Sequence, residues 1–389
     1  MSSPAHVVKI EAAGGAERAL IGGKAWSLQS LLDMGAAVPP ACVLTTQAYR
    51  DWTRHREPQW LRDRLAEAVG MLESTTGRQF GAGPQGLIVS VRSGAPVSMP
   101  GMMDTVLNVG LGRLPPGTEA YLYDARVRFL WQFAELVLDL GQPVLEGLRG
   151  RFAGLGAPAM AGPLEQALQA LAEEQGKSWP ASAMDELLAA AGAVFASWQS
   201  SRAKLYRRMR KIDDSIGTAV TIQQMVFGNR DAQSGSGVVF TRNPTSGADG
   251  LCGEFLFGGQ GEEIVSGRET AGSIAQWRER QPEPFRELAA LGKRLEEATG
   301  KVHEIEFTLE QGRLYVLQCR PALLTGRAAA RVAVDFHDEG RISRAEAVVY
   351  ARSHGFDPTA SGRGLVVRPG ERPIAMGLPV GGGVAVGRV

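Results

Sequence analysis

The stretch "EIEFTLEQGRLYVLQCR", residues 304–320, says the most about the fold of this chain. Apolar and polar residues alternate in both halves of the stretch, which predicts a β-hairpin with one apolar and one polar face. The polar face of the first strand carries Glu304, Glu306 and Thr308. On the returning strand, the alternation groups Leu314, Val316, Gln318 and Arg320. The alternation fixes which residues face each other across the hairpin only to within about one residue. In either register, Glu306 and Gln318 are expected to lie close together.

The polar residues of this hairpin suit a site for magnesium and phosphate. Mg²⁺ takes a few oxygen ligands from the protein and keeps water and phosphate oxygens in its shell. Glu304, Glu306 and the amide of Gln318 supply such oxygens, and Arg320 can clamp a phosphate. The alternative is an ordinary amphipathic hairpin whose polar face meets water.

Two cations in the first hundred residues also suggest an anion site. Lys24 follows two glycines at the start of a predicted helix, from about Ala25 to Met34, and the N-terminus of a helix favours anions. Arg92 lies near the end of the predicted strand "LIVSVRS", before a loop of small residues. Each residue has a simpler interpretation, a glycine turn for Lys24 and a surface salt bridge for Arg92.

The loop "SMPGMMD", residues 98–104, combines flexible methionines with Gly101 as a hinge. A lid that closes over phosphates needs mobility, exclusion of water and backbone N–H donors. The loop is therefore a candidate phosphate-covering lid. The alternative is a turn packed into the core, with methionine as a filler.

The second half of the chain repeats this pattern of charged residues at strand ends. Arg242 ends a predicted strand where Asn243 and Pro244 turn the chain, and a glycine loop carries Gln260 and Glu262. Two strand-rich lobes of this kind, with a flexible loop from the first, suggest ATP held between the lobes. That is the arrangement of an ATP-grasp fold.

The composition is that of an ordinary globular protein and argues against several functional classes. In 389 residues, 42 Lys and Arg balance 41 Asp and Glu, which leaves no field to attract nucleic acid or an anionic membrane. No apolar run approaches the ~18 residues of a membrane-spanning helix, and the start of the chain does not read as a signal peptide. The three cysteines are widely separated, so free thiols in a reducing cytosol are expected. We therefore expect a cytoplasmic, multidomain protein.

Helical periodicity between the two strand-rich regions predicts a helical insert. Its basic run "RAKLYRRMRK", residues 202–211, is interpreted as a solvated helix face, with Leu205 and Met209 as the apolar stripe toward the core. The expected fold is α+β, of a two-lobed ATP-grasp type with this insert. The expected parts are 1–112 (first lobe with the phosphate-covering loop), 113–211 (insert), 212–325 (second lobe), 326–376 (helical linker) and 377–389 (start of a further domain).

Three segments closely resemble the N-terminal nucleotide-binding domain of the pyruvate, phosphate dikinase family: "VRSGAPVSMPGMMDTVLNVGL", "TAVTIQQMVFGN" and "IEFTLEQGRLYVLQCR". The segment "GGKAWSLQSLLDMGAAVPPACVLTT" is similar to the opening of that domain. The resemblance runs from about Val8 to Tyr350 and is weaker in the insert. The SMPGMMD loop separates this family from the phosphoenolpyruvate synthases and rifampin phosphotransferases.

The resemblance implies an activity and its participants. In that family, ATP pyrophosphorylates a histidine on a separate swivelling domain and leaves AMP, and inorganic phosphate then takes the terminal phosphoryl group as pyrophosphate. The remaining phosphohistidine converts pyruvate to phosphoenolpyruvate on a barrel domain. The implied partners are ATP, inorganic phosphate and the swivelling domain, in cis or in trans, with Mg²⁺ as cofactor. A homodimer of the full enzyme is compatible with the resemblance, and no nucleic-acid or membrane partner is expected.

The resemblance also implies catalytic and metal-binding roles. Lys24 and Arg92 would clamp phosphates, and Arg320 would stabilise the charge that develops during transfer. Glu306 and Gln318 would bind magnesium and the ribose-phosphate part of the nucleotide.

Other residues would bind the rest of the nucleotide. The strand Gln223–Val226 would border the adenine, and Gly101 would be the pivot of the lid. The full implied ATP-binding set is Lys24, Arg92, Ser98, Gly101, Met102, Asp104, Thr105, Gln223, Gln224, Met225, Val226, Arg242, Gln260, Glu262, Glu304, Glu306, Gln318 and Arg320.

Several positions depart from the pattern of the family. Ala25, Glu304 and Cys319 stand where glycine, aspartate and threonine are usual. The five histidines lie outside the T-S-H-A context of the acceptor: His6, His55, His303, His337 and His354. The segment "GLPVGGGVAVGRV", residues 377–389, resembles the first strand of the swivelling domain, so we expect either a fragment cut at that boundary or a natural short paralogue.

The leading functional prediction is the ATP-binding, pyrophosphoryl-donating part of a dikinase of this family. One alternative is a non-catalytic module that senses nucleotides. Another is a dikinase that phosphorylates a different acceptor in trans. Retention of Lys24, Arg92 and Arg320 argues against a purely sensing role, because binding alone would tolerate loss of the transfer arginine.

Overall fold

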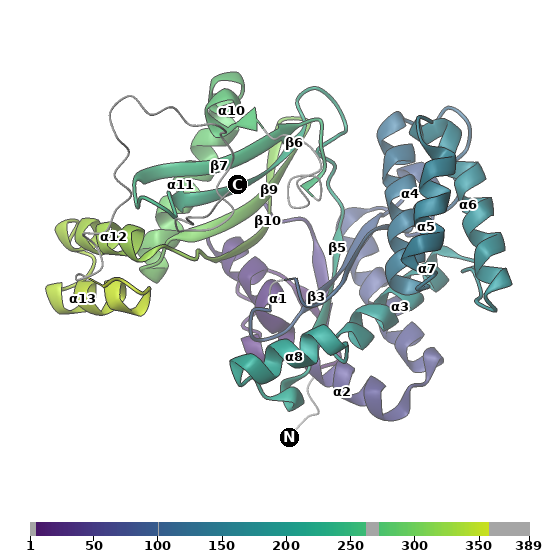
Figure 1. The fold of residues 1–389 in the computed structure, drawn as a ribbon, viewed down its shortest axis with the longest axis horizontal. Helices are drawn as coiled ribbons and strands as arrows, with labels where there is room; N and C mark the ends of the chain where they lie inside the picture. The colour runs from purple at the N-terminus through teal and green to yellow at the C-terminus, as the bar shows by residue number, and fades with distance from the viewer. Residues whose placement is uncertain (1–4, 100, 262–271, 358–389) are drawn as a thin grey trace, which may run out of the picture. The chain divides into compact units, whose positions relative to one another are not determined.

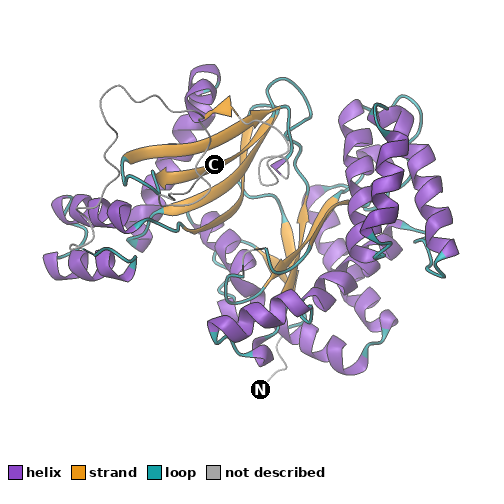
Figure 2. Ribbon diagram, in the orientation of Figure 1, coloured by secondary structure: helices purple, strands orange, loops and turns teal. Residues whose placement is uncertain are grey.

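The computed structural model describes residues 5–99, 101–261 and 272–357. The chain divides into two compact units, which we call the N-terminal unit (Met1–Arg230) and the C-terminal unit (Asp231–Val389) (Figure 1). Each unit contains one five-stranded antiparallel sheet together with helices (Figure 2). The predicted mixed α/β fold with two strand-rich regions is therefore confirmed. The predicted tail, residues 377–389, lies outside the described residues.

The sheet of the N-terminal unit has the strand order β1-β2-β5-β3-β4, and each pair of neighbours is antiparallel. Its strands are β1 (Val7–Ile10), β2 (Ala41–Leu44), β3 (Val89–Gly94), β4 (Thr105–Val109) and β5 (Ala219–Gln224). The central position of β5 differs from our expectation, which placed its residues in the second lobe. The strand returns after the helical insert to fill the gap between β2 and β3, a pairing of distant segments that local sequence does not reveal.

Helices cover both faces of this sheet. Helix α1 packs on one face, and helices α3 and α7 pack on the other. Ser90 is consequently buried, as are its neighbours Val89 and Val91 on the opposite face of β3. The helices of this unit are α1 (Arg18–Asp33), α2 (Thr46–His55), α3 (Pro58–Thr76), α4 (Ala120–Gln132), α5 (Gln142–Phe152), α6 (Ala157–Glu174), α7 (Ala183–Ser197) and α8 (Ser201–Arg210), with a π-helical turn over Phe133–Val137.

Helix α1 starts earlier than expected and is interrupted at Gly22. This residue has a φ of 78°, and a Cβ atom there would overlap the carbonyl oxygen of Gly94 at the end of β3. The N–H of Gly23 donates to the carbonyl of Ala95 at 2.9 Å. Only glycine permits both this backbone conformation and this close approach. The interruption therefore places the part of α1 that begins with Gly23 and Lys24 in contact with the end of β3.

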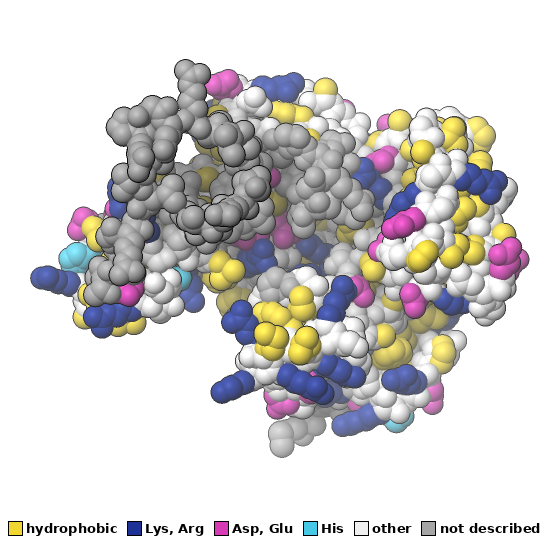
Figure 3. Space-filling view, in the orientation of Figure 1, with side chains coloured by type: hydrophobic (Ala, Val, Ile, Leu, Met, Phe, Trp, Pro, Cys, Tyr) yellow, Lys and Arg dark blue, Asp and Glu magenta, His cyan; other side chains and the backbone are white. Residues whose placement is uncertain are grey.

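Helix α8 turns a different face to the core than the sequence suggested. Leu205 and Met209 are 59% and 76% exposed, whereas Ala203 and Arg207 are buried. The guanidinium of Arg207 lies 4.0 Å from the ring centroid of Trp198 and donates to the carbonyl of that residue at 2.7 Å. The predicted apolar stripe is therefore wrong, because the arginine and its aromatic partner occupy the inward face. Lys and Arg side chains gather on the surface around α8 (Figure 3).

The sheet of the C-terminal unit has the strand order β10-β9-β6-β7-β8. Helices α10 and α11 pack on one face, where Phe307 stacks on Trp277 with ring centroids 4.8 Å apart. A Cβ atom at Gly235 or Gly237 would overlap the aromatic rings of this face. The elements of the unit are β6 (Gly235–Arg242), β7 (Asp249–Phe257), β8 (Gly272–Ser273), α10 (Ile274–Arg280), α11 (Pro282–Thr299), β9 (His303–Glu310), β10 (Arg313–Pro321), α12 (Gly326–Asp338) and α13 (Arg344–Ser353).

The described helices do not include one that is long and apolar enough to cross a lipid bilayer. The three cysteines are free thiols, as expected: Cys42, Cys252 and Cys319. Burial raises the pKa of Cys42 and of Cys319 to about 12, so both thiols stay protonated and unreactive at neutral pH.

Candidate functional site

Arg92 and Gln223 form the centre of the candidate site in the N-terminal unit. Strand β3 pairs with β5 so that Arg92 lies opposite Thr221, and Ser90 lies opposite Gln223. The Nη1 of Arg92 donates to the Oε1 of Gln223 at 3.2 Å. Gln223 is itself buried and donates through Nε2 to the carbonyl of Pro39 at 3.2 Å. The amide therefore orients a guanidinium that is only partly buried.

Lys24 lies at the same end of strand β3. A Cβ atom built on Gly94, two residues after Arg92, would be 3.6 Å from the Cβ of Lys24. The interruption of α1 at Gly22 creates this proximity. The structure thus brings together Lys24 and Arg92, which are 68 residues apart in the sequence.

The candidate lid is partly packed into the core. Met99 is buried, and Met102 and Met103 pack against the main core cluster, which agrees with the alternative of methionine as a filler. Ser98 and Gly101 are exposed, and Gly101 has a φ of 68°. Pro100 lies outside the described residues. A lid function of this loop stays a prediction.

The base of this loop is anchored to the helical insert. Asp104 forms an ion pair with Arg202 on α8, and its N–H donates to the Oγ of Ser197 on α7 at 3.3 Å. Burial raises the pKa of the Asp104 carboxyl. Thr105 follows in β4 and lies opposite Arg92. Asp104 is therefore held by protein groups, and the loop is fixed where it enters β4.

The residues predicted to border the adenine continue strand β5. The N–H of Gln224 donates to the carbonyl of Pro40, and that of Met225 donates to the carbonyl of Ile88, both at 2.9 Å. Val226 is buried. These bonds fix the backbone of the segment, and its role toward adenine stays a prediction.

The hairpin of the C-terminal unit pairs as predicted on its polar face. Gln318 lies opposite Glu306, and Arg320 lies opposite Glu304. The Nε and Nη2 of Arg320 donate to the Oε1 of Glu304 at 3.0 and 2.6 Å. The structure therefore brings together the four residues that the hairpin argument used.

One detail of the hairpin differs from the expectation. A β-bulge interrupts the pairing between Val316 and Gln318. Leu314 and Val316 are buried, whereas Gln318 and Arg320 are partly exposed. The predicted grouping of these four residues on one face is wrong, because the extra residue of the bulge shifts the alternation.

Sequence reasoning missed a third carboxylate on this polar face. Glu254 on β7 lies opposite Val238 on β6, and Val238 lies opposite Glu306 on β9. Glu254, Glu306 and Gln318 therefore form one row across the sheet. The signal was present in the alternation of "LCGEFLF", residues 251–257. The described part of the chain contains no group of three or more His, Cys, Asp or Glu side chains that could hold a metal ion.

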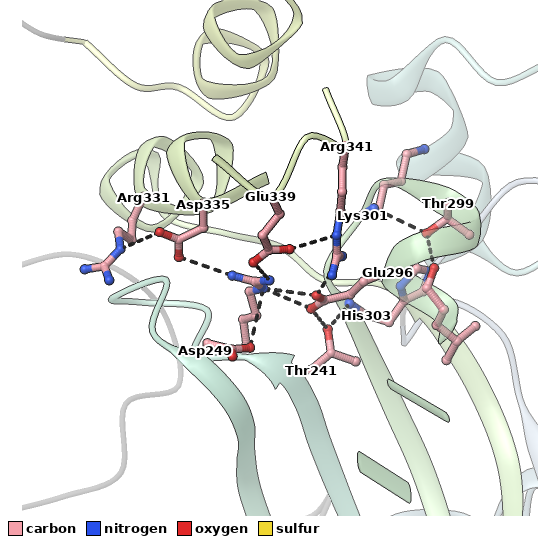
Figure 4. Close-up of polar contacts among 12 residues, drawn as sticks. Thr241, Asp249, Glu296, Thr299, Lys301, His303, Arg331, Asp335, Glu339 and Arg341 are labelled. Atoms are coloured by element: carbon pink, nitrogen blue, oxygen red, sulfur yellow. Dashed lines mark hydrogen bonds and ion pairs between the residues drawn. The ribbon is translucent and has the colours of Figure 1, made fainter. Parts of the chain in front are cut away.

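Arg242 has a structural environment, contrary to the predicted role in ATP binding. It is 2% exposed, and its guanidinium donates to Glu296 at 3.0 Å, Asp335 at 3.2 Å and Glu339 at 3.1 Å. Figure 4 shows these carboxylates converging from α11 and the end of α12. The guanidinium also lies 4.8 Å from the ring centroid of Phe336. Arg242 thus ties α12 to the sheet and is fully occupied by protein groups.

The predicted glycine loop is described only in part. Gln260 is buried, and Glu262 lies outside the described residues. Their predicted contacts with ATP stay predictions.

Comparison with known proteins agrees with the resemblance of the motifs. The family described as "Pyruvate phosphate dikinase, AMP/ATP-binding domain" matches residues 57–282. The pyruvate, phosphate dikinase of Clostridium symbiosum is 36% identical in an alignment 407 residues long, gaps included. The alignment covers 98% of this chain and 46% of that protein. Pyruvate, phosphate dikinase 2 of Oryza sativa subsp. japonica is 37% identical over 395 residues, 95% of this chain and 44% of that protein.

The chloroplastic pyruvate, phosphate dikinase of Flaveria pringlei is 36% identical over 396 residues, 96% of this chain and 41% of that protein. The chain therefore spans less than half the length of these relatives. The match of the family covers more than half of the chain and includes the strands that carry Arg92 and Gln223. The chain belongs to the family of the pyruvate phosphate dikinase AMP/ATP-binding domain.

Proposed function

We propose that this chain binds Mg-ATP and donates its pyrophosphoryl group, as the nucleotide-binding part of a pyruvate, phosphate dikinase with an ATP-grasp fold. The complete reaction would convert ATP, phosphate and pyruvate to AMP, pyrophosphate and phosphoenolpyruvate. The acceptor histidine would lie on a swivelling domain, supplied in cis or in trans. The observation that carries the proposal is the convergence of Lys24 and Arg92 at one end of β3, where a buried amide orients the guanidinium.

Two cations at this position can neutralise the charge of a polyphosphate. A partly exposed arginine presents a planar set of donors that matches phosphate oxygens, and a lysine adds a mobile point charge. Gln223 orients the guanidinium of Arg92 and adds no negative charge of its own. We expect Arg92 and Lys24 to bind the phosphates and to stabilise the charge that moves during transfer.

The polar face of the C-terminal unit fits magnesium in a particular way. Glu306 and Gln318 lie opposite each other, and Glu254 belongs to the same row. This small set of oxygens suits an ion that shares its shell with water and nucleotide phosphates, and does not suit a closed protein cage. We propose that Glu306 and Gln318 hold Mg²⁺ and that Arg320, now paired with Glu304, contacts the transferred phosphate. When bound, magnesium would neutralise the phosphate oxygens.

Titration calorimetry with ATP, with and without Mg²⁺, tests this proposal. The chain is expected to bind Mg-ATP in the micromolar range, about −8 kcal/mol. Glu306→Gln removes one anionic ligand oxygen, so it is expected to weaken Mg-ATP binding about 10-fold while leaving metal-free ATP binding unchanged. Glu310→Gln, at the far end of the same strand, is the matched control. Equal affinities of wild type and folded Glu306→Gln for Mg-ATP would refute the metal role.

A further inference from the structure

Thr221 carries a buried hydroxyl that the fold leaves unsatisfied. The residue lies on the central strand β5 and is 1% exposed, and its Oγ1 has no hydrogen-bond partner among the residues that the structure describes. Other buried hydroxyls nearby are bonded: that of Thr218 donates to the carbonyl of Ala219 at 3.1 Å, and that of Ser90 donates to the carbonyl of Gln223 at 3.4 Å. An unpaired buried hydroxyl costs folding free energy, so its retention needs an explanation.

Among the described residues, no side chain fills a small position beside this hydroxyl, over Gly94. A Cβ atom built there would be 3.7 Å from the Oγ1 of Thr221, 3.6 Å from the Cβ of Lys24 and 3.9 Å from the carbonyl oxygen of Ala219. These are ordinary van der Waals distances, so the position can hold one atom. Because Gly94 has no Cβ atom, this position stays open among the residues that the structure describes.

The surroundings of this position select the kind of atom that would fill it. Thr221 lies directly opposite Arg92, and Lys24 forms the other wall. A threonine hydroxyl can donate one hydrogen bond, and both neighbouring side chains are cations. The position therefore favours an anionic oxygen over a cation or an apolar group.

We propose that Thr221 is a further nucleotide-binding residue, whose hydroxyl donates to a phosphate oxygen lodged over Gly94. This inference rests on the proposed function and adds a neutral donor to the two cations. Because the hydroxyl is covered in the present structure, the inference includes a small side-chain movement when the polyphosphate enters. Thr221 would then gain the hydrogen bond that it lacks in the ligand-free protein.

Thr221→Val tests this inference through two measurements that should change in opposite directions. Valine keeps the shape but removes the unsatisfied hydroxyl, so the melting temperature of the ligand-free protein is expected to stay equal or rise. Affinity for Mg-ATP is expected to fall about 10- to 100-fold, the loss of a hydrogen bond to a charged group. Thr221→Ser should restore binding. Binding of adenosine, which has no phosphate, should be unchanged.

Thr218→Val is the matched control, because it removes a buried hydroxyl that already has a partner. It is expected to lower the melting temperature and to leave Mg-ATP affinity unchanged. Gly94→Ala tests the same position with a second, independent substitution. Its methyl group would fill the empty position without overlap, so the protein should fold normally and bind Mg-ATP more weakly. If both changes act on one oxygen, the double variant should lose no more than the more damaging single variant.

The outcomes separate this inference from the proposed function. If the wild type binds Mg-ATP and Thr221→Val binds it equally well, the inference is wrong and the proposed function stands. A lower melting temperature for Thr221→Val would show that the hydroxyl is already bonded, and would also overturn the inference. If Thr221→Val loses adenosine binding to the same extent as Mg-ATP binding, the contact lies away from the phosphates and the inference is wrong. If the wild type does not bind Mg-ATP, the proposed function and the inference both fail.

Discussion

Arg92 and Arg242 occupy similar places in the sequence and opposite environments in the structure. Each lies at the end of a strand and precedes a turn or loop. Arg242 is buried and bonded to three protein carboxylates, whereas Arg92 is partly exposed and donates to the neutral amide of Gln223. The comparison teaches that burial within a carboxylate cluster distinguishes a structural arginine from a partly exposed arginine that can meet a ligand.

The largest expected effect comes from removing the guanidinium of Arg242. Arg242→Met leaves Glu296 and Asp335 as negative charges that have lost their central partner. Breaking such a buried ion pair typically costs 3–5 kcal/mol, so a fall of about that size in the free energy of unfolding is expected. Arg92→Met, at a partly exposed site, is expected to cost under about 1 kcal/mol. Urea unfolding of both variants measures this contrast.

The same two variants should differ in the opposite direction in ligand binding. Arg92→Met is expected to weaken Mg-ATP binding, while any Arg242→Met protein that folds should bind normally. Similar stabilities for the two variants, or a binding defect confined to Arg242→Met, would break the comparison.

Arg320 tests whether an arginine paired with one carboxylate can still serve the reaction. Its contact with Glu304 leaves the side chain 38% exposed. If Arg320 stabilises charge in the transition state, Arg320→Ala should slow transfer roughly 10²- to 10³-fold, equivalent to ~2.7–4 kcal/mol. The measurement is AMP formation in the presence of the acceptor-bearing domain. Arg313→Ala, an exposed arginine on the same strand, is the control and should react at the wild-type rate. Unchanged AMP formation in folded Arg320→Ala would remove this residue from the site.

His303 lies beside the Arg242 cluster (Figure 4) and makes the stability of the protein depend on pH. Burial lowers the pKa of His303 from 6.5 to about 4. Because the folded state disfavours the charged imidazole, its contribution to stability is present above the unfolded pKa of 6.5 and is lost as the pH falls toward 4. Between pH 6.5 and 5 this loss amounts to roughly 2 kcal/mol.

His303→Gln removes the titrating group and should remove this part of the pH dependence. Urea unfolding of wild type and variant at pH 7.5, 6.5, 5.5 and 5 measures the difference in slope, since other groups titrate in both proteins. Parallel slopes would mean that His303 keeps its ordinary pKa in the folded protein.

Sequence alone predicted the local pairings well and the distant ones poorly. Sequence reasoning brought Glu306 close to Gln318 from the short turn alone, because two strands joined by a short turn pair with each other. It failed at the bulge before Gln318, where one extra residue reverses the faces of the strand. It also failed for β5, whose partners β2 and β3 are separated from it by long stretches of chain. Register defects and sheet membership depend on partners that a single segment does not contain.

The residues of the candidate site show the same difference between what could and what could not be predicted from the sequence. The motif residues Lys24 and Arg92 could be named from the sequence, but their meeting depends on the approach of Gly22 to Gly94. The ligand role of Arg242 was inferred from its position at a strand end, and the carboxylates that occupy it come from α11 and α12. Sequence therefore identifies charged residues more reliably than it identifies their partners.

The smallest expected effect concerns helix α8, where the sequence offered two apolar positions for the core. Leu205 and Met209 are mostly exposed, so Leu205→Gln and Met209→Gln are each expected to change the free energy of unfolding by less than about 0.5 kcal/mol. If these side chains formed the buried stripe that the spacing suggested, each change would cost several times more, about 2–5 kcal/mol for truncation of a buried Leu or Met. Leu164→Gln, at a fully buried position of α6, is the control that should show the large effect. Urea unfolding at neutral pH measures all three variants. A loss above about 2 kcal/mol for Leu205→Gln would mean that α8 packs through its apolar face, and that the guanidinium of Arg207 is not the inward group.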